Sequence, residues 1–419
     1  MENLVIDTFG LDIAQIRSDF PMLQKVKNGK PLIYFDSAAT FHKPKIVIDR
    51  LHDYYLNEYA KPMEQHSMSP LTTEMVEEVR KKVAAFIGAK SSKEIIFVKG
   101  STEGINLIAL SFSRSVLKEG DEIIISQLEH HANIIPWQLA AKMTGAKLLV
   151  APIKTNGDLD MDMFQAMITP QTKIVSLAHS SNVLGTVFDI KHIASICHQR
   201  NVPLFVDGAQ MAPHSPLNVQ ELDCDFYTFS VHKMGGTSGL GVLYGKEEWL
   251  LKLEPAEGGE DMAEEVKYDH TTYADLPKKF EAGTAPFADI IALGELLKYL
   301  EKLDMHRTMQ YELELLSYAT AQLSQISGLK IYGTSAEKEP VISFDLKGFD
   351  LKELESYLSD EWNIAVRAGK LSAQPLMEVL NVQTLLRASF TYANTVGEID
   401  SFCEAINSFI ATRSNNQAV

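Results

Sequence analysis

Between residues 80 and 250, short β-rich runs alternate with stretches that have helical spacing. The predicted strands are Glu94–Val98, Glu122–Ser126, Lys147–Ala151, Lys173–Ala178, Pro203–Asp207, Asp225–Ser230 and Gly241–Tyr244. The predicted helices include Thr102–Phe112, Asn133–Thr144, Met161–Met167 and His192–Arg200. This alternation is typical of a wound, mainly parallel sheet with helices on both faces, so the sequence predicts an α/β fold.

A chain of 419 residues exceeds what one hydrophobic core usually organises, so we expect two domains. Residues 1–30 are expected to pack with the small domain, 31–300 to form the large domain, and 301–419 to form a small α+β domain. The acidic segment Glu254–Gly283 is interpreted as a long loop, and Asp289–Leu323 as a long helical region. The predicted small-domain strands are Pro340–Leu346, Ile364–Arg367 and Ala388–Tyr392.

Composition excludes several classes of protein. The net charge of −16 argues against nucleic acid binding, which needs clustered Lys and Arg. No apolar run approaches the roughly 20 residues that span a bilayer, and the N-terminus has no basic region typical of a signal peptide. Cys197, Cys224 and Cys403 are widely spaced and show no metal-ligand pattern, which fits a reducing compartment. We expect a cytoplasmic small-molecule enzyme without a metal site.

Polar groups follow five of the predicted strands, where ligands of open α/β sheets bind. The turn Gly100–Gly104 opens a helix and suits a phosphate, although a hydroxyl there is more often a plain N-cap. Asp207 ends an apolar strand and needs a partner, with an N-cap role as an equal alternative. His130, Asn182 and Lys233 follow three further strands. A phosphate cradle, an imidazole, a carboxylate and a lysine together match pyridoxal 5′-phosphate (PLP).

A set of motifs in a fixed order carries a family resemblance over almost the whole chain. The motifs are YFDSAAT (34–40), STEGIN (101–106), EHHANIIPW (129–137), SNVLGT (181–186), VDGAQ (206–210), LDCDFYTFSVHK (222–233), FEAGT (280–284), PLM (375–377) and RAS (387–389). The chain resembles the class V aminotransferase family, and most closely its group II cysteine desulfurases and selenocysteine lyases. The resemblance implies the fold type I PLP scaffold and a homodimer with its active site at the subunit interface.

The resemblance also implies the catalytic and cofactor-binding residues. Lys233 would carry PLP as a Schiff base, and Asp207 would pair with the pyridine nitrogen so that the ring accepts electrons from Cα. Gln210 would reach the ring hydroxyl oxygen, and His130 would stack on the ring. The implied phosphate-binding residues are Ser101, Thr102, Ser230, His232 and, from the second subunit, Thr284.

Further residues are implied for the amino acid substrate. Arg387 and Asn182 would bind its α-carboxylate, a task for which a bidentate guanidinium is well suited, and Asn182 would also contact the cofactor. The family usually has a His-Arg-Gly run followed by a further His. The corresponding segment 61–66 is one residue shorter here, and His66 aligns with the further His only. Ser372 stands where cysteine desulfurases carry their nucleophilic cysteine, and we interpret it as a plain loop residue.

The serine at position 372 decides between reactions. A serine cannot carry a persulfide, and none of the three cysteines lies near it in sequence. The sequence therefore predicts a PLP lyase that eliminates the Cβ substituent of cysteine or a cysteine-derived substrate. One alternative is a cysteine desulfurase or selenocysteine lyase that forms alanine. An alternative of another class is a non-catalytic relative that binds PLP or a partner protein.

Overall fold

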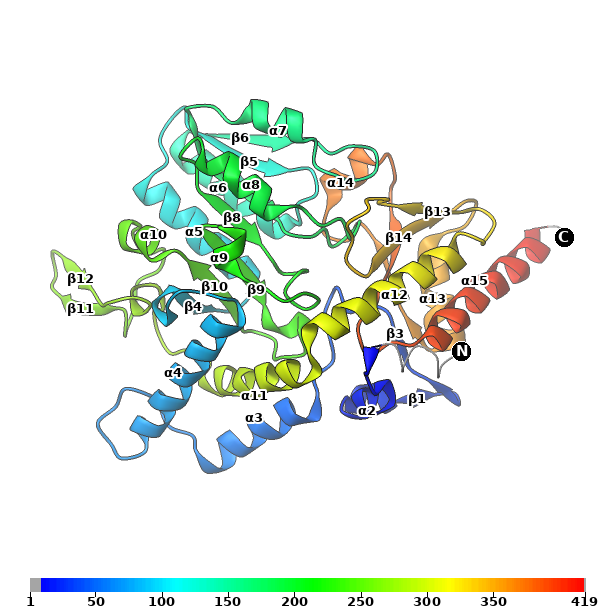
Figure 1. The fold of residues 1–419 in the computed structure, drawn as a ribbon, viewed down its shortest axis with the longest axis horizontal. Helices are drawn as coiled ribbons and strands as arrows, with labels where there is room; N and C mark the ends of the chain where they lie inside the picture. Colours follow the sequence, from blue (N-terminus) through cyan, green and yellow to red (C-terminus); the bar gives the residue numbers. More distant parts are fainter. Residues whose placement is uncertain (1–8, 418–419) are drawn as a thin grey trace.

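A seven-stranded sheet forms the centre of the larger part of the chain, whose computed structural model describes residues 9–417 (Figure 1). Its strand order is β4-β10-β9-β8-β7-β5-β6. The strands are β4 (Ile95–Val98), β5 (Glu122–Ser126), β6 (Lys147–Ala151), β7 (Thr172–Ala178), β8 (Leu204–Asp207), β9 (Phe226–Ser230) and β10 (Gly241–Gly245). Only β10 runs antiparallel to its neighbours, so the predicted mainly parallel sheet is confirmed, with each strand within one residue of its predicted ends.

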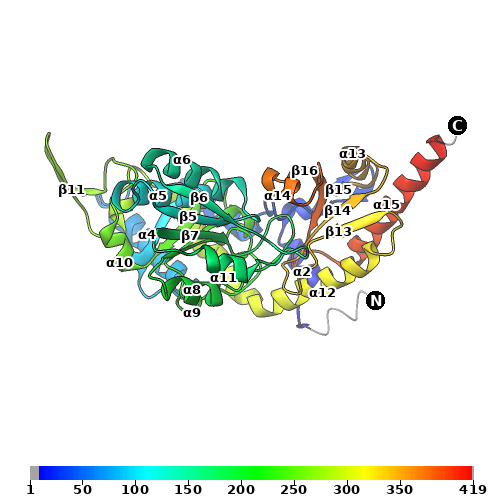
Figure 2. The same cartoon turned by 90° about the horizontal axis from the view of Figure 1, so that it is seen from above.

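Helices cover both faces of this sheet, which therefore separates two hydrophobic cores (Figure 2). Side chains alternate between the two faces along each strand. Ile123 and Ile125 of β5 face α5 (Ser101–Ser115), α6 (Ile135–Thr144) and α10 (Glu247–Lys252). Ile124 faces the other core, to which four helices described below contribute. Burial on both faces explains why these strands read as continuous apolar runs.

The remaining helices surround these cores and the smaller part of the chain. They are α2 (Ile13–Ser18), α3 (Lys45–Asn57), α4 (Ser69–Phe86), α7 (Met161–Met167), α8 (Ile190–His198), α9 (Val219–Leu222), α11 (Phe287–Leu303), α12 (Met305–Leu323), α13 (Leu351–Trp362), α14 (Gln374–Val379) and α15 (Val396–Gln417). Within residues 9–417, none of the helices combines the length and apolarity needed to cross a bilayer.

The predicted helical region Asp289–Leu323 is two helices, α11 and α12. Asp304 separates them with a left-handed backbone (φ 62°), and its side chain accepts a hydrogen bond from the N–H of His306 at 3.1 Å. Helix α8 begins two residues before its predicted start because Asp189 caps it, accepting from the N–H of His192 at 3.0 Å. Local capping chemistry thus sets helix ends that apolar spacing alone misses.

A four-stranded antiparallel sheet organises the smaller part, in the order β13-β14-β17-β16. The strands are β13 (Leu329–Tyr332), β14 (Val341–Leu346), β16 (Arg367–Gly369) and β17 (Leu385–Ser389). The predicted strand Ala388–Tyr392 is wrong by three residues at each end, because the backbone leaves the sheet after Ser389. The predicted strand Ile364–Arg367 is divided, since β15 (Ile364–Ala365) pairs with the N-terminal β3 (Ile33–Tyr34) instead.

The segment Glu254–Gly283 is not a plain loop. It contains the hairpin β11 (Ala263–Val266) and β12 (Thr271–Tyr273), which projects away from the sheet (Figures 1 and 2). A short hairpin, β1 (Val26–Lys27) and β2 (Lys30–Pro31), lies near the N-terminus. Arg17 pairs with Glu398 of α15 at 2.7 Å, so this segment contacts the smaller part. Residues 1–8 of the predicted N-terminal segment lie outside the described residues, and the boundaries at 30 and 300 stay predictions.

Candidate active site

A cavity of about 210 Å³ opens at the carboxyl ends of the parallel strands, between the large sheet and the four-stranded sheet. Ten of the residues predicted for the site line it. They are Ser101, Thr102, His130, Asn182, Asp207, Gln210, Ser230, His232, Lys233 and Arg387. Nine of them lie at or after predicted strand ends, up to 132 positions apart in the chain, while Arg387, implied by the family resemblance, joins them from the smaller sheet.

Lys233 enters the cavity from the 3-10 turn Val231–Lys233, directly after β9. Burial lowers the pKa of its ammonium to about 8, and the nearby Arg387 and Arg367 act in the same direction. Asp207 and Asp36 partly oppose this shift. The amine therefore loses its proton far more readily than an exposed lysine does, which suits a nucleophile that forms a covalent bond with a carbonyl compound.

Asp207 ends β8 and presents a buried carboxylate to the cavity. Its Oδ1 accepts from the N–H of Ala209 at 3.0 Å, so an N-cap-like contact is present as well. Burial raises the pKa of this carboxyl, while Lys233 acts to lower it. The turn requires Gly208, because a Cβ there would lie 2.1 Å from the ring of Tyr227. The carboxylate is thus held on a rigid backbone, and a cationic partner would stabilise its charged form.

His130 lies at the start of a 3-10 turn that precedes α6. Its Nδ1 accepts from the N–H of Ala132 at 3.0 Å, so the proton of the neutral ring resides on Nε2. Burial lowers the pKa of His130 to about 4, with Lys233 contributing in the same direction. The imidazole is therefore uncharged at neutral pH where it lines the cavity.

Hydroxyl groups and a helix N-terminus gather at another edge of the cavity. Ser230 Oγ accepts from the N–H of Ser101 at 2.9 Å and lies 3.0 Å from Ser101 Oγ. These groups meet at the start of α5, whose N-cap, Gly100, supplies no side-chain partner for the free N–H groups. A Cβ at Gly241 would lie 2.5 Å from Gly100 Cα, so glycine is needed to bring β10 this close. This arrangement fits a phosphate group.

Arg387 is almost completely buried beside the cavity and is held by the protein itself. Its Nη2 donates to Asp36 Oδ1 at 2.6 Å, and its Nη1 donates to the carbonyl of Asn182 at 3.1 Å. Within residues 9–417, Arg387 Nε and Asn182 Oδ1 are buried without a hydrogen-bond partner. An unsatisfied buried polar atom costs about 1–3 kcal/mol. Of these two atoms, Arg387 Nε is a donor that suits a carboxylate, whereas Asn182 Oδ1 can only accept a hydrogen bond.

Two charged residues of this site were not predicted from the sequence. Asp36 pairs with Arg387, and Arg367 of β16 lines the cavity directly across the strand pair from Arg387. Asp36 lies inside the motif YFDSAAT, which signalled its importance without a specific role. Arg367 precedes the Ser372 loop in sequence, and only the pairing of β16 with β17 places it opposite Arg387.

Three predicted residues do not line the cavity in a single chain. His66 is exposed in the loop before α4, and Thr284 lines a neighbouring hollow with Phe97. Thr284 was predicted to act from a second subunit, so its place in one chain leaves that prediction open. Ser372 lies beside the cavity-lining Leu371, and its carbonyl accepts from the N–H of His131 at 2.8 Å.

The cysteines of the described residues lie away from the cavity. Cys197 and Cys224 are buried in the core, and Cys403 lies on α15. None of the three, all within the described residues, lines the cavity. Burial raises the pKa of Cys197 to about 12 and that of Cys403 to about 11, so neither is a thiolate at neutral pH.

Comparison with known proteins gives the family. A model of the class-V aminotransferases matches residues 33–402. The chain belongs to the class-V aminotransferase family. The predicted family, the fold type I architecture and the predicted PLP-dependent enzyme class are thereby confirmed.

Several proteins that are similar to this chain are named cysteine desulfurases. The chain is 44% identical, over 97% of its length, to probable cysteine desulfurase 1 of Mycobacterium leprae, and 46% identical, over 94%, to a probable cysteine desulfurase of Mycolicibacterium paratuberculosis. It spans 66% and 58% of those proteins. A cysteine desulfurase of Serratia proteamaculans is 45% identical over 93% of this chain and 96% of its own. The structure of the Escherichia coli cysteine desulfurase CsdA matches with a TM-score of 0.89 at 36% identity, covering 96% of this chain and 99% of CsdA.

Proposed function

We propose that this class-V aminotransferase family member is a lyase that eliminates the Cβ substituent of cysteine or a cysteine-derived amino acid. With cysteine, one water is consumed, and the products are pyruvate, ammonia and hydrogen sulfide. The observation that carries the proposal is the cavity itself. It holds the lysine, carboxylate and arginine for work at an amino acid Cα. The proposal adds that Ser372 occupies the position at which the family resemblance places a persulfide-forming cysteine.

The residues present fit PLP. In the proposal, Ser101, Thr102, Ser230 and His232 hold its phosphate, and Asp207 pairs with its ring nitrogen. His130 lies on the ring face, and Gln210 reaches the ring hydroxyl while its Nε2 donates to the carbonyl of Ala38 at 2.9 Å. Bound PLP supplies an electron sink for the electron pair released at Cα.

The other steps belong to the side chains. Arg387 and Asn182 bind the substrate α-carboxylate, which orients the Cα–H bond toward Lys233. Lys233 Nζ accepts that proton, a role supported by its pKa of about 8. Sulfur leaves from Cβ to solvent, because Ser372 cannot retain it as a persulfide.

A second candidate reaction is favoured by the names of the relatives. A cysteine desulfurase or selenocysteine lyase converts its substrate to alanine, and release of selenium does not depend on a protein thiol. The two candidates differ in the carbon product. A third outcome, binding of PLP or a partner protein without turnover, would make the protein a non-catalytic relative.

One assay separates these reactions. Purified PLP-loaded protein is incubated with cysteine, cystine and selenocysteine, and the carbon product is identified, with K233A as the inactive control. Pyruvate supports elimination, alanine supports the second candidate, and no turnover with any of them contradicts both.

We further infer that the enzyme is a cytoplasmic homodimer whose active site lies at the subunit interface. His66 and Thr284 lie outside the cavity of their own chain, which fits a role in the site of the partner chain. A monomeric mass of the PLP-loaded protein in solution would contradict this part of the proposal.

A further inference from the structure

A buried ion pair joins the turn after β8 to helix α12, outside the cavity. His214 Nδ1 lies 2.8 Å from Glu312 Oε2, and the two residues are 4% and 1% exposed. His214 follows the cavity residues Asp207 and Gln210 on one continuous turn, in which its N–H donates to the carbonyl of Met211 at 3.0 Å. The pair therefore fixes the far end of the turn that presents Asp207 and Gln210.

The second oxygen of the same carboxylate reaches the smaller sheet. Glu312 Oε1 accepts from the backbone N–H of Tyr392 at 2.8 Å. Tyr392 lies five residues after Arg387, just beyond the end of β17, and its buried ring contacts Phe41 with centroids 5.7 Å apart. One carboxylate thus connects the turn that carries Asp207 to the strand that carries Arg387.

His214 and Glu312 shift each other's pKa in this buried setting. Burial acts to lower the pKa of His214, but the carboxylate of Glu312 outweighs it and raises the pKa overall. Burial raises the pKa of Glu312, while His214 acts in the opposite direction. Buried ion pairs add little net stability compared with apolar side chains, but removing one partner is strongly destabilising. A pair of this kind is better suited to fixing a geometry than to stabilising the fold.

We propose that His214 and Glu312 are positioning residues, which set the place of Arg387 relative to Asp207 and thereby the affinity for the substrate α-carboxylate. They do so without touching substrate or cofactor. This inference rests on the proposed roles of Arg387 and Asp207 given above, and it is independent of which carbon product the enzyme forms.

The test compares variants of Glu312 in the PLP-loaded protein. E312A removes both contacts and is expected to raise the KM for cysteine by about tenfold, with kcat changed by less than about threefold, because displacement of a binding group weakens ground-state contacts. E312Q keeps an acceptor for Tyr392 and is expected to restore most of the affinity. The absorbance of bound PLP stays unchanged in both variants.

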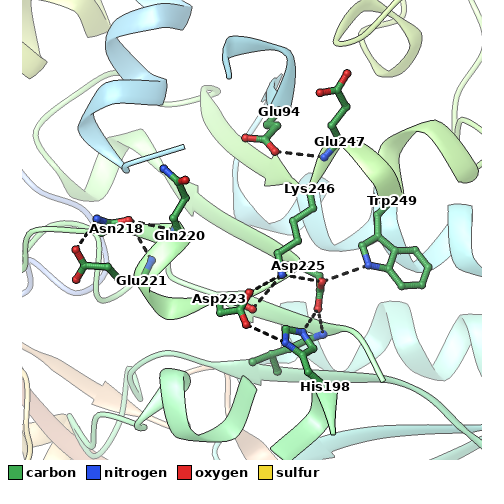
Figure 3. Close-up of polar contacts among 11 residues, drawn as sticks. Glu94, His198, Asn218, Gln220, Glu221, Asp223, Asp225, Lys246, Glu247 and Trp249 are labelled. Carbon is green, nitrogen blue, oxygen red and sulfur yellow. Dashed lines mark hydrogen bonds and ion pairs between the residues drawn. The ribbon is translucent and has the colours of Figure 1, made fainter. Parts of the chain in front are cut away.

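A matched control lies in the seven-stranded sheet, at the strand ends opposite to the cavity. His198 contacts Asp223 and Asp225 at 3.1 and 2.8 Å, at the amino end of β9 (Figure 3). H198Q removes a comparable histidine–carboxylate contact far from the cavity, so it is expected to lower Tm without changing KM. An equal rise of KM in H198Q would overturn the proposal, since it would show a general loss of stability.

Two further variants keep the test decisive. If E312A does not fold, E312D shortens the same side chain and is expected to raise KM about threefold. An unchanged KM in folded E312A or E312D overturns the inference. R387K tests the proposed function separately, with an expected rise in KM of at least tenfold from loss of the bidentate contact. If R387K leaves the KM for cysteine unchanged, the proposed role of Arg387 fails. If KM rises in R387K but not in the Glu312 variants, only the positioning role is contradicted.

Discussion

Arg387 Nη2 donates to Asp36 Oδ1 at 2.6 Å, so the guanidinium proposed to bind the substrate already has a carboxylate partner in the protein. A substrate carboxylate would share Arg387 with Asp36, and the two negative charges would repel each other. D36N keeps an oxygen acceptor for Nη2 but removes the charge. We expect the KM for cysteine to fall by about threefold in steady-state kinetics, a modest Coulombic effect in a partly solvated site. A large rise in KM would show that the charge of Asp36 orients Arg387 instead.

Attachment of PLP to Lys233 should depend on pH with a midpoint near 8. Burial lowers the pKa of this ammonium to about 8, and only the neutral amine attacks an aldehyde. The rate at which apoprotein takes up PLP, followed by absorbance, should therefore rise with pH up to about 8 and then level off. A rate that continues to rise toward pH 10 would indicate an ordinary lysine pKa and contradict the role of burial.

Ser372 should contribute little to turnover. Its fixed contact is made by its backbone carbonyl with the N–H of His131, which any side chain allows. S372A is therefore expected to change kcat/KM by less than about twofold. S372C, its counterpart with a thiol, is not expected to release alanine, because the preceding Lys370 and Leu371 supply no imidazole to accept the thiol proton. A loss of activity by more than about tenfold in S372A would give the hydroxyl a catalytic role.

The His198 cluster should make stability depend on pH (Figure 3). The hydrogen bond to Asp225 raises the pKa of His198 above its ordinary value of 6.5. The stabilisation is fully present below the pKa of the unfolded chain and is lost as pH rises through the higher pKa of the folded protein. The difference in Tm between wild type and H198Q should therefore be larger at about pH 6 than at about pH 9. An equal difference at both values would exclude a charged His198.

The sequence predicted the large sheet well, because its strands are buried on both faces and read as apolar runs between turns. It also brought together nine cavity residues, since parallel strands bring their carboxyl ends to one edge, and the family resemblance added Arg387. It missed β13, although its partner β14 follows soon after it in the chain. It also missed the pairing of β15 with β3, which depends on a contact between segments more than 300 residues apart. Asp36 escaped prediction because it reaches Arg387 from the N-terminal segment, across 351 positions of the chain. Arg367 escaped prediction because only the pairing of β16 with β17 places it opposite Arg387.

The central claim is that sulfur leaves the substrate without passing to a protein thiol. A single turnover of cysteine by the PLP-loaded protein, with pyruvate, alanine, sulfide and protein-bound persulfide all quantified, tests it most directly. We predict pyruvate and sulfide in equal amounts with no persulfide on the protein. Alanine accompanied by a protein persulfide would contradict the account.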